Sequence, residues 1–172
     1  GLIPSLLAFL CSRVCNPLLN ILNPTLNFLP GTISALPVVR GIWLYADSQI
    51  THNAKECIDI AQRDWDSVET SCDFQKLSMT ENSSKTLVDA VHSLELQLQG
   101  QLCRMKELEE QNSRFFIESY GLQDELSPEV PDDQITLYRH DREEDIKRLL
   151  SYAIGCLMGR YSLDKPGLIY AH

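Results

Sequence analysis

Apolar residues near the end of the chain recur with the period of an α-helix. Seven of them fall on one helical stripe, namely Ile146, Leu149, Leu150, Ala153, Ile154, Leu157 and Met158. Asp141, followed three residues later by Glu144, predicts the start of this helix, and Gly159 supplies a stop signal. We therefore expect a helix over 141–159 whose apolar stripe packs against another helix.

A second apolar pattern predicts one long helix over about 84–120, with Gly100 as its weak point. The a positions of a heptad repeat hold Val91, Leu98, Met105 and Asn112, and the d positions hold Leu87, Leu94, Gln101, Leu108 and Phe115. The pattern fits either a hairpin against a helix predicted at 52–69 or a self-associating coiled coil. Polar residues at 101 and 112 interrupt the apolar seam, which favours the hairpin.

Glycine and proline mark the segment between these two helices. Gly121 follows Tyr120 and can adopt the left-handed conformation that ends a helix, after which Leu122 can fold back on the last turn. Ser127 and Val130 each precede a proline, which excludes helix there. We expect an extended crossing from the long helix to the last one.

Proline also marks a boundary in the first part of the chain. Five of the eight prolines lie in the first 37 residues, and the next one follows Ser127. Before a boundary near 37–46 we expect a buried helix, a short extended piece at 25–28 and a tight turn at Pro30-Gly31, and 168–170 looks like the start of a strand. The predicted class is mainly α: a helical bundle with a long hairpin or coiled-coil arm and minor short β segments.

The apolar run at the start of the chain does not read as a signal peptide or a membrane span. Pro4 and Arg13 interrupt it, no basic segment leads it, and it is too short to cross a bilayer. We interpret it as a buried helix and expect no membrane partner.

Charge is distributed unevenly. The chain has 15 Lys and Arg against 24 Asp and Glu, a net charge of −9, whereas residues 1–46 hold two Arg and no acid. The basic residues at 139, 140 and 142 are flanked by Asp141, Glu143 and Glu144, which cancel most of their field. An acidic chain without a basic patch cannot attract DNA phosphates by bulk charge, so we expect weak DNA binding by this segment.

The six cysteines, at 11, 15, 57, 72, 103 and 156, include no C-x-x-C pair and no paired histidine spacing. This pattern predicts neither a zinc site nor a redox motif. Buried reduced thiols fit a helical chain better than disulfides do, and they favour a cytoplasmic location.

Acidic residues gather around two aromatic residues, Trp65 and Phe74, near the end of the helix predicted at 52–69. The acids are Asp64, Asp66, Glu69 and Asp73. They could form a cation site or a dock for a basic partner, or Trp65 and Phe74 could anchor the helix and the following loop to the core. Acids at a helix C-terminus oppose its dipole and are best left in water, which favours the anchor.

No catalytic, cofactor-binding or metal-ligating set is predicted. Asp132, Asp145 and Lys147 match the letters of a Mg²⁺ nuclease motif, but that chemistry needs Asp145 and Lys147 on one side of a strand. In a helix the two side chains point apart. The four histidines are scattered and have no serine or cysteine partner at a recognisable spacing.

Several stretches follow the order of a known family. They are Asn20–Phe28, Asp64–Ser67, Glu69–Ser71, Asp73-Phe74, Asn112–Pro131, Ile135–Leu137 and Arg142–Asp164. In them the chain resembles the non-catalytic middle of the BREX (phage-growth-limitation) adenine-specific DNA methyltransferases, with a weak match over 76–102. The resemblance implies structural roles for Asn23, Pro24, Asn27 and Phe28, and the chain departs from the family at Cys72, where a Trp is expected.

The resemblance also implies an activity for the full-length protein. The family uses S-adenosylmethionine to methylate N6 of adenine in a short asymmetric DNA site, which marks host DNA during phage defence. Such enzymes carry a glycine-rich cofactor loop and an Asn-Pro-Pro-Tyr loop, whereas Asn23-Pro24 matches only the first two letters of the latter. We expect no cofactor in this fragment, and contact with DNA or other phage-defence components only through the full-length protein.

The resemblance suggests a domain order. Residues 1–46 would end a preceding methyltransferase or recognition region, 47–164 would form a helical spacer between catalytic and target-recognition parts, and 165–172 would begin a truncated C-terminal domain. The alternative is a helical adaptor or coiled coil that binds protein and has no tie to DNA.

Overall fold

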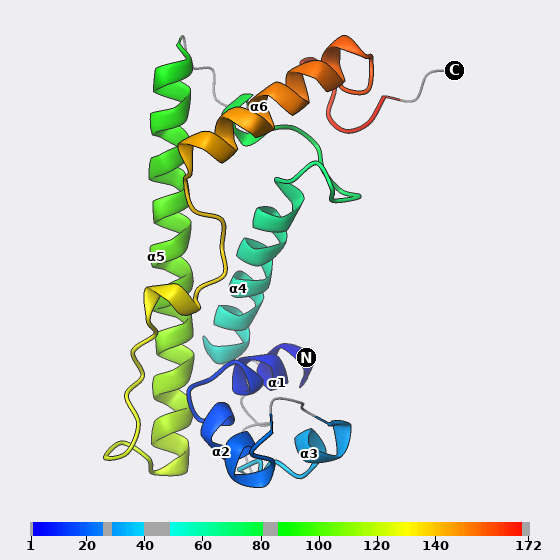
Figure 1. Cartoon of the computed structure of the whole chain (residues 1–172). Helices are drawn as coiled ribbons and strands as arrows, with labels where there is room; N and C mark the ends of the chain where they lie inside the picture. The colour runs from blue at the N-terminus through cyan, green and yellow to red at the C-terminus, as the bar shows by residue number, and fades with distance from the viewer. Residues whose placement is uncertain (1, 26–28, 40–48, 81–85, 170–172) are drawn as a thin grey trace. The chain divides into compact units, whose positions relative to one another are not determined.

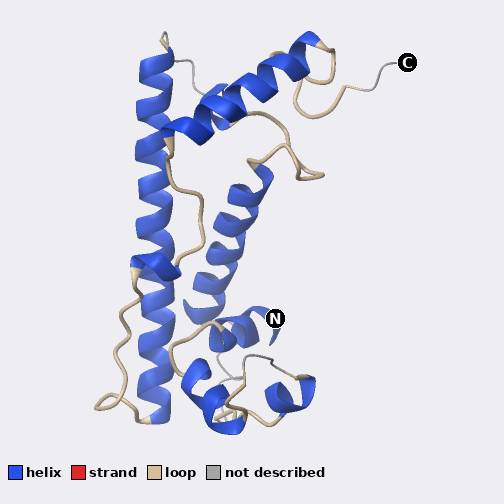
Figure 2. Ribbon diagram, viewed as in Figure 1, coloured by secondary structure: helices blue, strands red, loops and turns tan. Residues whose placement is uncertain are grey.

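The computed structural model describes residues 2–25, 29–39, 49–80 and 86–169. In these ranges the α-helices are α1 (Leu2–Leu10), α2 (Cys15–Leu22), α3 (Pro30–Ser34), α4 (Gln49–Asp66), α5 (Leu87–Tyr120) and α6 (Arg142–Leu157), with 3₁₀ turns η2 (Ser78–Thr80) and η3 (Asp132–Gln134) (Figure 1). The described residues contain no strand (Figure 2). The mainly α class is confirmed, and the hairpin or coiled-coil arm stays a prediction.

Helix boundaries follow the predicted capping signals closely. The Asp141 side chain accepts a hydrogen bond of 2.9 Å from the Glu144 amide at the start of α6, as the capping pattern predicts. Gly121 and Gly159 adopt φ angles of 68° and 75° just past α5 and α6. The Leu122 amide donates to the Ile117 carbonyl at 3.0 Å, which is the predicted fold-back at the end of α5.

Three local predictions differ from the structure. α5 continues unbroken through Gly100. Pro30 begins the short helix α3 where a turn was predicted, because its fixed φ suits the first helical position. Residues 168 and 169 are irregular, and the other extended piece, at 25–28, lies largely outside the described residues.

The chain forms two compact units. Unit 1 comprises Gly1–Asp59 and Arg104–Ile135, and unit 2 comprises Ile60–Cys103 and Thr136–His172. Helices α4 and α5 therefore each contribute residues to both units. The proline-rich first segment packs with the second half of α5 in unit 1, and the domain boundary near 37–46 stays a prediction.

The core of unit 1 is apolar and centred on Phe9. Its ring lies edge-on to Phe116 at 5.4 Å and stacks on Tyr120 at 5.8 Å between centroids. The Tyr120 hydroxyl reaches the Pro37 carbonyl at 2.6 Å, which holds the proline-rich segment against the end of α5. Buried Asn53 donates its amide N–H groups to Gln111 and Asn112, which links α4 to α5 within unit 1.

The apolar start of the chain is buried on one side. Ala8 and Phe9 are buried in unit 1, as predicted, whereas Ile3 is 80% exposed. No described helix is by itself long and apolar enough to cross a membrane. The pair Ile3–Leu10 and Cys15–Leu22 reaches that length and hydropathy only together, with a bend of 73°.

The core of unit 2 is built from aromatic rings. Phe74 lies edge-on to Tyr152 at 6.1 Å and to Tyr161 at 5.4 Å, and the two tyrosines stack at 5.3 Å. Gly155 makes this possible, because a Cβ there would lie 2.5 Å from the Tyr161 ring. The predicted burial of Phe74 is confirmed, whereas Trp65 is 65% exposed and does not act as the predicted anchor.

The predicted stripe of α6 is not buried. Leu150, Ile154 and Leu157 are 58%, 55% and 88% exposed, so the prediction that this stripe packs on another helix is wrong. The helix buries a different face that carries Asp145, Tyr152 and Gly155. Those positions also recur with a helical period, but a carboxylate and a glycine do not register in a count of apolar residues.

Candidate functional site

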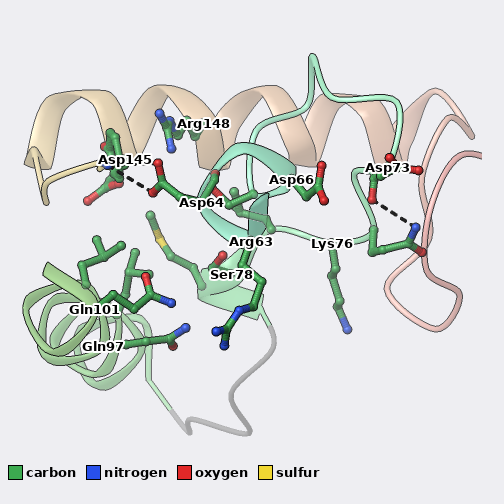
Figure 3. Close-up of a pocket in the computed structure, with 17 residues that line it drawn as sticks. Arg63, Asp64, Asp66, Asp73, Lys76, Ser78, Gln97, Gln101, Asp145 and Arg148 are labelled. Atoms are coloured by element: carbon green, nitrogen blue, oxygen red, sulfur yellow. Dashed lines mark hydrogen bonds between the residues drawn. The ribbon is translucent and has the colours of Figure 1, made fainter. Parts of the chain in front are cut away.

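The most elaborate polar arrangement in the described residues surrounds a hollow of about 350 Å³ in unit 2 (Figure 3). Its charged lining comes from the end of α4, the loop after it, and α6: Arg63, Asp64, Asp66, Asp73, Lys76, Asp145 and Arg148. Gln97 and Gln101 of α5 close another side of the hollow. Charges of both signs therefore lie close together around it.

Asp145 is the buried centre of this arrangement. Asp145 is only 3% exposed, and both of its carboxylate oxygens lie within hydrogen-bond distance of a partner. One oxygen accepts from the Tyr138 hydroxyl at 2.9 Å, and the other lies 2.6 Å from Nδ1 of His140. A buried carboxylate requires such donors, since an unpaired buried charge is strongly unfavourable. The position of Asp145 in the first turn of α6 adds a favourable interaction with the helix dipole.

Tyr138 connects this centre to α4. Its backbone N–H donates to both carboxylate oxygens of Asp64, at 3.1 and 3.2 Å, and the guanidinium of Arg148 lies 3.7 Å from the centre of its ring. Burial and the hydrogen bond to Asp145 raise the pKa of the Tyr138 hydroxyl to about 12. The hydroxyl therefore remains a donor at neutral pH.

The pKa of Asp64 is shifted by opposing causes. Burial raises it, and the hydrogen bond from Tyr138 and the charge of Arg148 lower it by a smaller amount, so the net direction is upward. Asp64 and Asp145 together hold the 136–140 segment against the end of α4 and the start of α6. Such an arrangement positions elements of the fold, because the four groups hydrogen-bond to one another.

The geometry opposes a nuclease at Asp132, Asp145 and Lys147. Asp145 is buried, whereas the exposed Lys147 ammonium pairs with Glu143 at 2.8 Å on another side of α6. Asp132 lies in η3 of unit 1, where it pairs with Lys106 at 2.6 Å. Among the described residues no group of three or more His, Cys, Asp or Glu side chains is arranged to hold a metal ion.

The acids near Trp65 and Phe74 are used inside unit 2, where solvation was predicted. Asp66 accepts from the Ser71 hydroxyl at 2.7 Å, and Glu69 accepts from the Ser151 and Tyr161 hydroxyls at 3.3 Å each. Because α4 ends at 66, the chain turns there, so that Asp66 accepts from a serine of the turn itself and Glu69 reaches hydroxyls of a distant segment. Sequence reasoning missed the role of Glu69 because its partners lie 82 and 92 residues away in the chain.

Sequence reasoning also missed the assembly of Tyr138, His140, Asp145 and Arg148. Acidic residues are common in the first turn of a helix, so the local sequence does not mark these four residues as partners. Their pairing depends on the path of the 136–140 segment, which no local pattern specifies.

The remaining predicted structural residues lie outside the hollow. The backbone N–H of Asn23 caps the C-terminal end of α2 by donating to the Leu19 carbonyl at 2.8 Å, and Pro24 is exposed. Asn27 and Phe28 lie outside the described residues. All six cysteines are free, but only Cys15 is fully buried, and the predicted burial is wrong for the exposed residues at 11, 72 and 103.

Two relatives with curated names match most of the chain, and no family model matches it. "Adenine-specific methyltransferase PglX" of Lacticaseibacillus casei (strain Zhang) is 35% identical over 170 residues, which cover 96% of the chain and 14% of that protein. "Adenine-specific methyltransferase BrxX" of Escherichia coli O9:H4 (strain HS) is 30% identical over 151 residues, 78% of the chain and 12% of that protein. The chain thus spans a small part of each relative's length. These matches confirm the resemblance: the chain corresponds to a segment of BREX-type adenine-specific methyltransferases.

Proposed function

We propose that this member of the BREX-type methyltransferases acts as a helical spacer within a site-specific DNA adenine-N6 methyltransferase of a phage-defence system. The observation that carries the proposal is the match over 96% of the chain to an adenine-specific methyltransferase of which it spans 14%. In the full-length protein the spacer joins the catalytic part to the target-recognition part, and DNA is the substrate.

Chemistry is assigned to other parts of the full-length protein. A methyltransferase of this kind takes its methyl group from S-adenosylmethionine and grips a flipped adenine with an Asn-Pro-Pro-Tyr loop. The 172-residue sequence contains no such loop, and Asn23-Pro24 is followed by Thr25 and Leu26. On this proposal the isolated chain neither binds S-adenosylmethionine nor methylates DNA.

The helices support a geometric role. α5 has 34 residues, which corresponds to a length of about 50 Å. Both α4 and α5 contribute residues to both compact units, so each unit is built partly on the same two helices. A net charge of −9 disfavours nonspecific binding of the spacer to phosphates, which leaves DNA contact to other parts of the protein.

A matched pair of substitutions at Gly100 tests the spacer in the full-length protein. Gly100 is exposed in the middle of α5, with no atom within 4 Å of an added Cβ. Gly100→Pro removes a helical hydrogen bond and kinks α5, whereas Gly100→Ala preserves it. We expect the Pro variant to lose most DNA methylation while it still binds S-adenosylmethionine, and the Ala variant to methylate normally.

The readouts are transfer of a tritiated methyl group to DNA, calorimetric binding of the cofactor, and circular dichroism to confirm folding. Full methylation by a folded Pro variant would overturn the spacer role. Micromolar binding of S-adenosylmethionine by the isolated 172-residue chain would contradict the assignment of chemistry to other parts.

A protein-binding adaptor without a tie to DNA is the second candidate, and the exposed apolar stripe of α6 favours it. Gel shifts and methylation assays on the full-length protein separate the two candidates. An adaptor would carry no methyltransferase activity in any length of the polypeptide.

A further inference from the structure

An apolar groove lies in unit 2 between the first turns of α5 and α6. It is a hollow of about 380 Å³ whose apolar lining is Leu87, Val88, Val91, Ile146 and Leu149, with buried Met79 beside them. We call this hollow the α5–α6 groove. It is separate in character from the charged hollow, because apolar side chains dominate its lining.

The side chains of the groove are exposed to an unusual degree. Leu87, Val88 and Ile146 are 57%, 77% and 49% exposed. The exposed apolar residues continue along α6 through Leu150, Ile154 and Leu157 at 58%, 55% and 88%. A contiguous apolar surface of this kind marks a binding site for another protein segment.

The spacing of the exposed residues on α6 indicates the shape of the partner. Positions 146, 150, 154 and 157 form a ridge at i, i+4, i+8 and i+11, which is the ridge that interdigitates with a second helix. The polar lining of the groove is His92, Glu95, His140, Arg142 and Asp145, which together form no basic cluster. A phosphate backbone is therefore a poor match, and an amphipathic helix with a mixed polar border is a good one.

We propose that the α5–α6 groove and the α6 ridge receive an amphipathic helix from another part of the same methyltransferase polypeptide. This inference rests on the proposed function. The chain matches a protein of which it spans 14%, so a protein of that kind supplies a long further stretch of polypeptide. A segment tethered in the same chain binds as an intramolecular partner and needs no separate association step, which favours it over a second copy.

Photo-crosslinking in the full-length protein tests this occupant. Benzoylphenylalanine replaces Leu150 on the ridge or, as a matched control three residues away, Lys147, which is 61% exposed and pairs with Glu143. After irradiation, the crosslinked peptides are identified by mass spectrometry. We expect the probe at 150 to crosslink within one polypeptide to residues outside the 172-residue chain, at least fivefold above the probe at 147.

Each other result overturns the proposal. Crosslinks between two polypeptides would assign the groove to a second copy, and crosslinks to unit 1 would assign it to this chain itself. Equal yields at 150 and 147, or no crosslink at 150, would mean that nothing is seated on the ridge.

Methylation of DNA by the same preparations distinguishes this inference from the proposed function. An active enzyme without the expected crosslink would refute the groove's occupant and leave the methyltransferase assignment intact. An inactive protein with the expected crosslink would refute the activity and leave the packing intact.

Discussion

The two compact units bury polar side chains in different ways. Among the described residues of unit 1, every buried polar side chain is neutral: Ser5, Ser12, Thr51, Asn53, Asn112 and Ser113. Among the described residues of unit 2, the buried polar residue is the acid Asp145. Unit 1 pairs several of these neutral groups across long sequence separations, such as Ser5 with Thr51 at 2.7 Å, around an aliphatic and phenylalanine core.

A buried carboxylate makes stronger demands on its surroundings than a buried amide or hydroxyl. Asp145 needs donors on both oxygens, and it obtains them from Tyr138 and His140 of the same short segment. Unit 2 therefore depends on the path of that segment, whereas unit 1 depends on the volume and shape of its apolar core. The difference predicts that single polar substitutions damage unit 2 far more than unit 1.

Removal of the Asp145 carboxylate provides the largest test. Asp145→Ala leaves two donors without their charged acceptor, and we expect a loss of about 3 kcal/mol or more from the free energy of unfolding. Asn112→Ala is the matched change in unit 1 and should cost only about 1 kcal/mol, because Asn53 keeps its bond to Gln111. Urea unfolding with hydrogen exchange resolved by unit measures both. Equal losses would remove the contrast between the units.

The aromatic core of unit 2 is tested at Gly155. Gly155→Ala places a Cβ 2.5 Å from the Tyr161 ring, so we expect a loss of about 1–3 kcal/mol. Gly100→Ala is the control in an open helical position and should stabilise the chain by about 0.5–1 kcal/mol. Thermal melts of the two variants check the opposite signs. A neutral Gly155→Ala would show that Tyr161 moves aside without cost.

The two units should lose stability at different alkaline pH values, because each contains a group whose pKa is raised in the folded state. Burial is the main cause that raises the pKa of Cys57 in unit 1 from 9.0 to about 12, and the pKa of Tyr138 in unit 2 rises from 10.0 to about 12. Both groups stay protonated in the folded state, so each contributes stability that is complete below its unfolded pKa and is lost as pH rises toward 12. Unit 1 should therefore begin to weaken near pH 9 and unit 2 near pH 10.

The expected loss is at most about 1.4 kcal/mol per pH unit for each group. Hydrogen exchange is measured for each unit between pH 8 and 10.5 and corrected for the intrinsic exchange rate. It gives the stability of each unit as a function of pH. Cys57→Ala should reduce the early loss in unit 1 and leave unit 2 unchanged. If Cys57→Ala leaves the profile of unit 1 as it was, another group is responsible.

The smallest effect is expected on the exposed ridge of α6. Leu150→Asp in the isolated 172-residue chain should change the free energy of unfolding by no more than about 0.5 kcal/mol, because Leu150 is 58% exposed. Leu94→Asp is the buried counterpart in unit 2, at 6% exposed, and should unfold that unit. Denaturant melts compare the two. A large loss at Leu150 would mean that the ridge is buried in the folded chain.

Local chemistry at helix ends was predictable from the sequence. Asp141 accepts from the Glu144 amide, Gly121 and Gly159 take the left-handed conformation, and proline excludes helix after Ser127. Each of these features depends on a few adjacent residues, because helix capping and backbone sterics act over one turn. The mainly α class followed from them and from the apolar periodicity.

Which face of a helix is buried was decided only by the tertiary structure. Residues on both faces of α6 recur with a helical period. The face with more apolar residues, which includes Leu150 and Ile154, was predicted to be buried, whereas the structure buries the face with Asp145, Tyr152 and Gly155. A carboxylate can be buried only when donors reach it, and the path of the 136–140 segment brings them to Asp145, so apolar periodicity alone does not reveal its burial. The sequence by itself determined where the helices begin and end and which family they resemble. The tertiary structure decided which surfaces meet, because that depends on partners distant in the chain.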